Sequence, residues 1–272
     1  MILRGSVPSA VLGMDTGITV ITPGTYHLSE ALQDGEKPYK VAYLLHGLYG
    51  NNSSWADYTM LPAYAGDYHM IFIMPEAARS FYTDMACGQA YFTYISEELP
   101  AICRKTFQIS SKREDTFVIG GSAGGYGALR LGLTFPERFG CIMAFSSAGL
   151  FMEENVRDVK TNWSGCSLKD ADEKTRLMLR DMEAAFGPGL ICRPEDSLIQ
   201  LAGKAAGEGR SFPKICMSCG DQDPYLEENR RFKHILETLP EISLFYEEIP
   251  GCHDWHYFDK ALQNSLDRFC RE

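Results

Sequence analysis

The stretch that most constrains the fold is residues 116–133, Thr-Phe-Val-Ile-Gly-Gly-Ser-Ala-Gly-Gly-Tyr-Gly-Ala-Leu-Arg-Leu-Gly-Leu. An apolar, β-branched run passes through glycines into a segment whose larger apolar residues recur at helical spacing, which predicts a buried strand, a tight turn and a helix. The turn Gly120-Gly121-Ser122-Ala123-Gly124 matches G-x-S-x-G, the nucleophile elbow. In such an elbow the serine takes a strained backbone conformation, and the amide of Ala123 points to where an oxyanion would form.

The motif alone does not establish chemistry, because an ordinary serine in a glycine-rich turn has the same pattern. A serine nucleophile also needs a histidine base, a carboxylate that orients this histidine, and hydrogen-bond donors for the oxyanion. The rest of the chain must therefore supply these groups.

Composition excludes several classes of protein. With 272 residues, 45% of them hydrophobic, the chain suits one large α/β domain spanning residues 1–272. The net charge of −10 argues against a nucleic-acid partner, which would require clustered Lys and Arg. We find neither a signal-peptide pattern at the N-terminus nor an apolar run long enough for a membrane span, so we expect no membrane partner and a cytoplasmic location.

The nine cysteines are odd in number and scattered, as reduced thiols would be. Cys216 and Cys219 form a C-x-x-C pattern, but no second Cys or His pair stands at metal-binding spacing. We therefore expect no metal and no cofactor.

Strands and helices alternate from residue 41 onward. Apolar runs predict strands at 41–45, 70–74, 117–119, 141–145, 212–219 and 242–247, and helices from about Ser53 or Ser54, at 91–106 with Pro100 bending or breaking it, after the elbow, and at 227–239. This order indicates a mostly parallel sheet covered by helices on both faces. Before residue 35 we expect short strands at Val11-Leu12 and 18–21, with a hairpin turn at 15–17.

Residues 150–211 separate two predicted strands by far more than one crossover needs. They contain a charged helix at 170–186, a Gly-Pro-Gly break and a short helix after Pro194. The segment is an insertion that forms either a helical cap over the site or a decorated crossover. We favour the cap, because the insertion leaves from the sheet edge where ligands bind in such folds.

Three histidines follow Ser122 in the chain, and one of them has the right setting for a base. His253 stands in a loop between the last strand and the last helix, whereas His234 lies within a helix. His256, one helical turn beyond His253, is the fallback. In enzymes with this elbow the acid and then the histidine follow the serine, so His253 is the predicted base.

The acid should follow the strand before that histidine loop, where two aspartates compete. Asp221 follows the strand at once and can cap the turn, whereas Asp223 is further out and better placed to reach the histidine loop, so we favour Asp223. A second oxyanion donor is expected after the strand at 41–45. Gly47 there lets the chain bend, so that the Leu48 amide can face Ser122.

These segments resemble the esterase D and S-formylglutathione hydrolase family of α/β-hydrolases, within its bacterial tributyrin-esterase and feruloyl-esterase-like branch. The matching motifs are Leu-Leu-His-Gly-Leu-Tyr-Gly-Asn-Asn-Ser-Ser-Trp (44–55), Gly-Gly-Ser-Ala-Gly-Gly-Tyr-Gly-Ala (120–128), Cys-Gly-Asp-Gln-Asp (219–223) and Gly-Cys-His-Asp-Trp (251–255). The resemblance implies an α/β-hydrolase fold, a triad of Ser122, Asp223 and His253, and an oxyanion hole formed by the Leu48 and Ala123 amides. It also implies the absence of a cofactor, and frequent homo-oligomers.

We therefore expect a serine carboxylesterase. Its substrate would be a small-molecule ester with a short-chain acyl or aryl group (acetyl, butyryl, feruloyl or cinnamoyl), hydrolysed through an acyl-enzyme. Three alternatives remain open: hydrolysis of S-formylglutathione, acyl transfer to a sugar or other alcohol, and a non-catalytic binding protein on a hydrolase fold.

Overall fold

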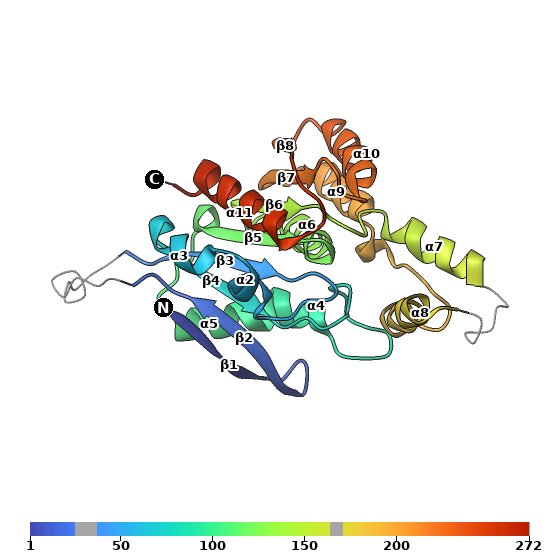
Figure 1. Cartoon of the computed structure of the whole chain (residues 1–272), viewed down its shortest axis with the longest axis horizontal. Coiled ribbons are helices and arrows are strands. Elements are labelled where there is room, and N and C mark those ends of the chain that lie inside the picture. Colours follow the sequence, from blue (N-terminus) through green and yellow to red (C-terminus); the bar gives the residue numbers. More distant parts are fainter. Residues whose placement is uncertain (25–36, 164–170, 272) are drawn as a thin grey trace.

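The structure, a computed structural model, describes residues 1–24, 37–163 and 171–271. Its centre is an eight-stranded sheet in the order β1-β2-β4-β3-β5-β6-β7-β8 (Figure 1). The strands are β1 (Ile2–Ser9), β2 (Met14–Ile21), β3 (Lys40–Leu45), β4 (Met70–Pro75), β5 (Thr116–Gly121), β6 (Cys141–Phe145), β7 (Lys214–Gly220) and β8 (Leu244–Ile249).

Only β1 and β2 depart from the parallel arrangement. β1 pairs antiparallel with β2, and β2 pairs antiparallel with β4, whereas every pair from β4 to β8 is parallel. The loops that follow β3, β5, β7 and β8 therefore all leave from the same edge of the sheet. This confirms the predicted α/β fold and places the four expected site loops side by side.

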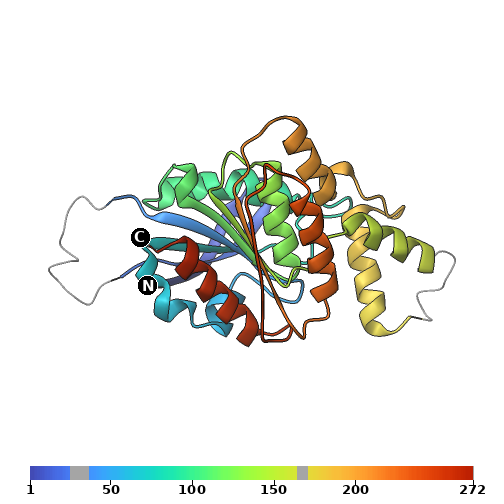
Figure 2. The same cartoon turned by 90° about the horizontal axis from the view of Figure 1, so that it is seen from above.

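Helices cover both faces of the sheet (Figure 2). One face carries α2 (Ser54–Tyr58), α3 (Leu61–Tyr64) and α11 (Trp255–Phe269), which share a buried apolar cluster with alternate side chains of the strands. The other face carries α4 (Tyr91–Thr93), α5 (Leu99–Thr106), α6 (Ala123–Thr134), α9 (Leu198–Gly207) and α10 (Leu226–Glu237), with a second such cluster. None of the described helices is long and apolar enough to cross a membrane.

Pro100 does not break its helix. The chain stays helical from Tyr91 to Thr106, but the π-helical turn η2 (Tyr94–Glu98) lies between α4 and α5. The Leu99 amide bonds to the Tyr94 carbonyl, five residues back. The helix thus accommodates a proline, which has no amide to donate, by changing its hydrogen-bond pattern just before it.

The predicted hairpin turn is wrong by a few residues. The turn lies at 10–13 and includes Val11 and Leu12, while residues 15–17 belong to β2. Gly13, at φ 67°, supplies the left-handed conformation that the turn needs. Gly17 serves a different purpose, since a side-chain carbon there would lie 2.7 Å from the Asn52 amide oxygen.

The long insertion contains more helix than the sequence indicated. It comprises α7 (Met152–Trp163), which we did not predict, α8 (Glu173–Phe186), the 3-10 turn η5 (Pro194–Asp196) and α9. The predicted helix at 170–186 begins at Glu173, because the Asp172 side chain accepts a hydrogen bond from the Thr175 amide and so caps it. Asp170 itself, like Cys166, is outside the described residues. Helices α7 and α8 lie beyond the carboxyl ends of the strands (Figures 1 and 2).

A buried ion pair fastens the insertion to the elbow helix. Arg130 of α6 and Asp196 of η5 approach to 2.7 Å, with side chains 2% and 0% exposed. Arg130 also donates to the Tyr82 carbonyl at 2.6 Å, and Arg193 donates to the Asp196 carboxylate at 3.0 Å. Because both charges are removed from water, each depends on its partner for stabilisation.

We expect Asp196→Ala to lower the free energy of unfolding by about 3–5 kcal/mol, since it leaves the Arg130 cation buried without its counter-charge. Urea unfolding measures the loss. Arg4→Ala is the matched control, because it breaks an ion pair with Asp57 whose side chains are 47% and 37% exposed. Similar losses in both variants would contradict the prediction.

Candidate active site

Ser122 stands at the apex of a strained turn between β5 and α6. Its backbone has φ 57° and ψ −128°, a left-handed conformation that a residue other than glycine rarely adopts. The flanking glycines make this turn possible. A side-chain carbon at Gly120 would lie 2.0 Å from the Gly124 carbonyl oxygen, and one at Gly124 would lie 2.2 Å from the Leu45 carbonyl oxygen. The structure thus has the elbow geometry that G-x-S-x-G predicts.

Three side chains that are far apart in the sequence form a chain of hydrogen bonds at this apex. His253 Nε2 lies 2.9 Å from Ser122 Oγ, and His253 Nδ1 lies 2.8 Å from Asp223 Oδ2. An ionised Asp223 can only accept, so Nδ1 carries the proton and Nε2 is left to accept from the serine hydroxyl. This is the arrangement in which a histidine can remove the proton of a serine.

The other candidates for the acid and the base do not contact Ser122 or His253 in the described structure. Asp221 accepts a hydrogen bond from the Gly251 amide at 3.1 Å, which ties the loop after β7 to the loop that carries His253. His234 is exposed on α10 and contacts Glu237, and His256 is exposed in the first turn of α11. Asp223 is thus the aspartate in contact with His253.

Asp223 is held in its ionised form. Burial by itself would raise its pKa, but hydrogen bonds from His253, the Tyr225 amide and the Ser146 hydroxyl outweigh burial and lower the pKa below the usual aspartate value. Ser146 follows β6 in a strained left-handed conformation, at φ 39°, and is fully buried. Sequence reasoning missed this serine, because only the fold brings the end of β6 against the loop after β7.

The loop after β3 supplies the expected second donor. A side-chain carbon at Gly47 would lie 3.3 Å from Ser122 Cβ, so this glycine lets the loop come close to the serine. Within the part of the chain that the structure describes, neither the Leu48 amide nor the Ala123 amide donates to a protein acceptor. His46 is buried and structural. Its Nδ1 lies 2.8 Å from the Gly47 carbonyl oxygen, and its Nε2 accepts from the Ala77 amide.

A pocket of about 340 Å³ opens beside Ser122 and His253. Its aromatic walls come from α2 and α11, and its rim from the loop after β3. Tyr49 and Tyr58 are 71% and 62% exposed, and the Tyr58 ring stacks on the Trp255 ring with centroids 5.3 Å apart. The aromatic residues that line it are Tyr49, Trp55, Tyr58, Trp255 and Phe258.

The described part of the insertion does not line this pocket. None of the described residues between 150 and 211 is part of its wall. Phe151, at the start of the insertion, is buried against the Phe232 ring and belongs to the core. The described helices of the insertion contribute no residue to this wall, and the interpretation of residues 150–211 as a cap stays a prediction.

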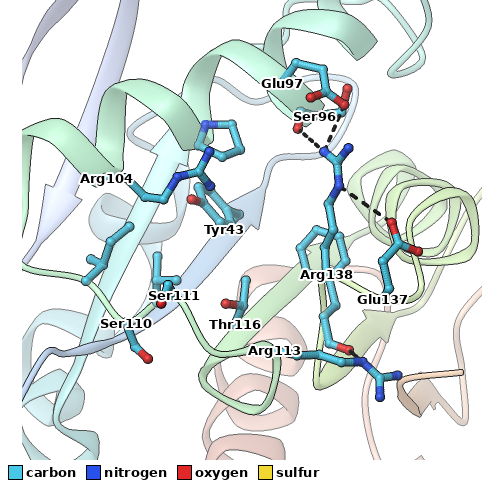
Figure 3. Close-up of a pocket in the computed structure, with 14 residues that line it drawn as sticks. Tyr43, Ser96, Glu97, Arg104, Ser110, Ser111, Arg113, Thr116, Glu137 and Arg138 are labelled. Atoms are coloured by element: carbon cyan, nitrogen blue, oxygen red, sulfur yellow. Dashed lines mark hydrogen bonds and ion pairs between the residues drawn. The ribbon is translucent and has the colours of Figure 1, made fainter. Parts of the chain in front are cut away.

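A second cavity, of about 540 Å³, is lined by residues near the amino ends of β3 and β5, away from the strand ends that carry Ser122. Figure 3 shows the side chains that line it. Arg138 there is engaged with the Ser96 carbonyl and Glu97, and Arg113 donates to the Phe139 carbonyl. The described residues that line this cavity include no histidine or cysteine. It therefore has no equivalent of the serine–histidine pair.

The two cysteines of the C-x-x-C pattern point to different neighbours. Cys216 Sγ lies 3.5 Å from Ser265 Oγ, and Cys219 Sγ lies 3.4 Å from Ser146 Oγ. Both are free thiols, and burial raises the pKa of each to about 12. Among the described ranges, no group of three His, Cys, Asp or Glu side chains is placed to hold a metal ion.

Comparison with known proteins agrees with this geometry. A family model described as "Putative esterase" matches residues 9–179. An acetyl esterase of Caldicellulosiruptor saccharolyticus is 31% identical over 231 residues, which cover 84% of this chain and 82% of the relative.

Solved structures cover the whole chain. The fluorophosphonate-binding serine hydrolase FphF of Staphylococcus aureus superposes with a TM-score of 0.84 and 28% identity, over 100% of this chain and 99% of that protein. The S-formylglutathione hydrolase FrmB of the same organism gives a TM-score of 0.80 and 28% identity, over 99% and 98%. Together with the family match, these similarities show that the chain belongs to the esterase family and is a carboxylesterase with the α/β-hydrolase fold.

Proposed function

We propose that Ser122, His253 and Asp223 form a catalytic triad that hydrolyses short-chain acyl or aryl esters through an acyl-enzyme. One observation carries this proposal: the two hydrogen bonds, of 2.9 and 2.8 Å, that link the Ser122 hydroxyl through His253 to a buried, ionised Asp223. They end at the mouth of an aromatic pocket that is open to substrate.

The geometry supports a two-stage reaction. In the first stage His253 Nε2 takes the Ser122 proton as Oγ attacks the ester carbonyl, and the imidazolium then protonates the departing alcohol. In the second stage His253 takes a proton from water as the water attacks the acyl-enzyme, and it then gives this proton to Ser122 Oγ as the acyl–oxygen bond breaks and the acid departs. Asp223 stays ionised and stabilises the imidazolium in both stages.

The tetrahedral intermediate of each stage carries a negative oxygen. The Leu48 and Ala123 amides are the proposed donors to it. Ala123 follows Ser122 in the chain, Leu48 lines the same pocket as Ser122, and neither amide has another protein partner among the described residues. Hydrogen-bond donors that are already in position need not move when the negative charge develops, so they stabilise the transition state strongly and contribute much of the rate enhancement.

The pocket supports a substrate with a small or flat acyl group. Its volume of about 340 Å³ is at the lower end of ligand pockets, and its aromatic walls favour an apolar group over a charged one. The acetyl esterase relative is consistent with an acetyl group. A solved ferulic acid esterase has the same fold, at 23% identity and a TM-score of 0.73.

Hydrolysis of S-formylglutathione is the second candidate. The similarity to an S-formylglutathione hydrolase over the whole chain favours it, and a formyl group is small enough for the pocket. Comparing kcat/KM for S-formylglutathione with values for p-nitrophenyl acetate, butyrate and a methyl hydroxycinnamate separates the two candidates.

We expect Ser122→Ala to lower turnover of p-nitrophenyl acetate and butyrate by roughly a thousandfold or more, because it removes the nucleophile. The variant should also fail to be labelled by a fluorophosphonate probe that labels the wild type. Equal turnover by the two proteins would refute the proposed function.

Asp223→Asn should lower kcat by roughly a thousandfold, because an amide in this place no longer holds the His253 tautomer that accepts the serine proton. Asp221→Asn is the matched control, two residues away. Its carboxylate contacts the Gly251 amide and not His253, so we expect a much smaller effect. A larger loss in Asp221→Asn than in Asp223→Asn would reverse the assignment of the acid.

The lowered pKa of Asp223 also predicts a pH-dependent stability. A carboxyl group whose pKa is lower in the folded state stabilises the fold above its unfolded pKa of about 4 and loses this effect as the pH falls through its folded pKa. The difference in free energy of unfolding between wild type and Asp223→Asn should therefore shrink from pH 7 to pH 3 in urea titrations. A difference that grows on acidification would mean that the folded pKa is raised.

A further inference from the structure

Three consecutive carbonyl groups in the loop after β3 accept hydrogen bonds. The His46 carbonyl accepts from the Tyr82 hydroxyl at 2.6 Å, and the Gly47 carbonyl accepts from the Gly50 amide at 2.9 Å. The Leu48 carbonyl accepts from Arg79 Nη1 at 3.1 Å. A trans peptide holds its N–H opposite its C=O, so the bond to the Gly47 carbonyl fixes the direction of the Leu48 amide, and the bond from Arg79 to the Leu48 carbonyl fixes the next peptide, which holds Leu48 from its other side.

Of these three donors, Arg79 is the one that also binds a residue of the insertion. Its Nε donates to Asp181 Oδ2 of α8 at 2.6 Å, and its guanidinium lies 4.9 Å from the centre of the Tyr49 ring. The side chains of Arg79 and Asp181 are only 26% and 14% exposed, so solvent screens this pair less than a surface pair. One planar side chain therefore joins α8 to two consecutive residues of the loop that carries the Leu48 donor.

Helix α8 provides a firm support for this contact. The Ala86 and Cys87 amides donate to the Ala185 and Ala184 carbonyls at the end of α8, at 3.0 and 2.9 Å. Phe81, which stands two residues after Arg79, packs its ring against the Phe186 ring at the end of α8. The segment that carries Arg79 is thus attached to α8 at both of its ends.

We propose that Arg79 is a positioning residue for the oxyanion hole, and that Asp181 of the insertion holds Arg79 in place. This inference rests on the proposed function, since it assigns a purpose to the Leu48 donor. The insertion then serves the site as a support behind the oxyanion loop, which agrees with the absence of its described residues from the pocket wall.

The charges of the pair predict an asymmetry between its two members. Removing Arg79 frees the Leu48 carbonyl and also leaves the Asp181 carboxylate unpaired near a site that must stabilise an anion. Removing the Asp181 charge leaves the bond from Arg79 to Leu48 possible but less well fixed. Loss of Arg79 should therefore be more harmful than loss of the Asp181 charge.

The test uses steady-state kinetics with p-nitrophenyl acetate on the full chain. We expect Arg79→Ala to lower kcat by about tenfold or more with KM changed by less than about threefold, because a misplaced donor reduces the stabilisation of the transition state more than that of the bound substrate.

Asp181→Asn should lower kcat less than Arg79→Ala does. The double variant Arg79→Ala/Asp181→Asn should be no worse than Arg79→Ala alone, since the unpaired carboxylate is gone. Arg79→Lys retains the positive charge but not the planar guanidinium that donates to Leu48 and Asp181 together, so its kcat should lie between those of Arg79→Ala and the wild type.

Arg231→Ala is the matched control. Arg231 of α10 also ties the insertion to the body of the protein, through hydrogen bonds of 2.7 and 2.6 Å to Glu154 of α7, but it does not touch the oxyanion loop. We expect this variant to keep the wild-type kcat. Thermal unfolding of every variant shows whether a change in kcat merely follows a change in stability.

Several results would overturn the inference. They are a wild-type kcat in Arg79→Ala, a rise in KM alone, or an equal loss in Arg231→Ala. If Arg79→Ala does not fold, the inference is overturned when both Arg79→Lys and Asp181→Asn keep the wild-type kcat. The failure of the proposed function is distinguishable, because only then would Ser122→Ala remain active.

Discussion

The close approach of the elbow helix to the neighbouring strand is the constraint on which the site depends. Gly124 lies so near the Leu45 carbonyl that no side chain fits between α6 and β3. This contact holds Ser122 at positive φ, a conformation that the chain would leave if the surrounding structure did not enforce it. Helix α6 contains four glycines and is a weak helix by propensity, so its stability comes from packing against the sheet.

The same packing puts the loop after β3 beside the serine. Parallel strands then bring the loops after β7 and β8 to this edge, where Asp223 and His253 meet Ser122. Ser146, another described residue at positive φ, follows β6 and hydrogen-bonds to Asp223. The carboxyl ends of the adjacent strands β5 and β6 are thus each followed by a strained serine, one placed as the nucleophile and one in contact with the acid.

Local sequence patterns predicted what local forces determine. Apolar β-branched runs marked the central strands, and the glycines around Ser122 marked the elbow, because strand burial and turn geometry depend on neighbours in the chain. The hairpin was misplaced because residues 15–17 carry a turn-like composition, whereas the left-handed glycine of the real turn is Gly13. Helix α7 was missed because its few apolar residues stand among many charges. Arg79 could not be assigned a role at all, since its partners at Leu48 and Asp181 are distant in the sequence.

The position of the insertion bears on the fate of the acyl-enzyme. With Tyr49 and Tyr58 exposed at the rim and no described residue of the insertion in the wall, the pocket communicates directly with bulk solvent. An enzyme that passes its acyl group to another alcohol must keep water away from the intermediate. A pocket of this shape does the reverse: in the proposed mechanism it exposes the acyl-enzyme to water, and we therefore expect hydrolysis to be the usual outcome of acylation.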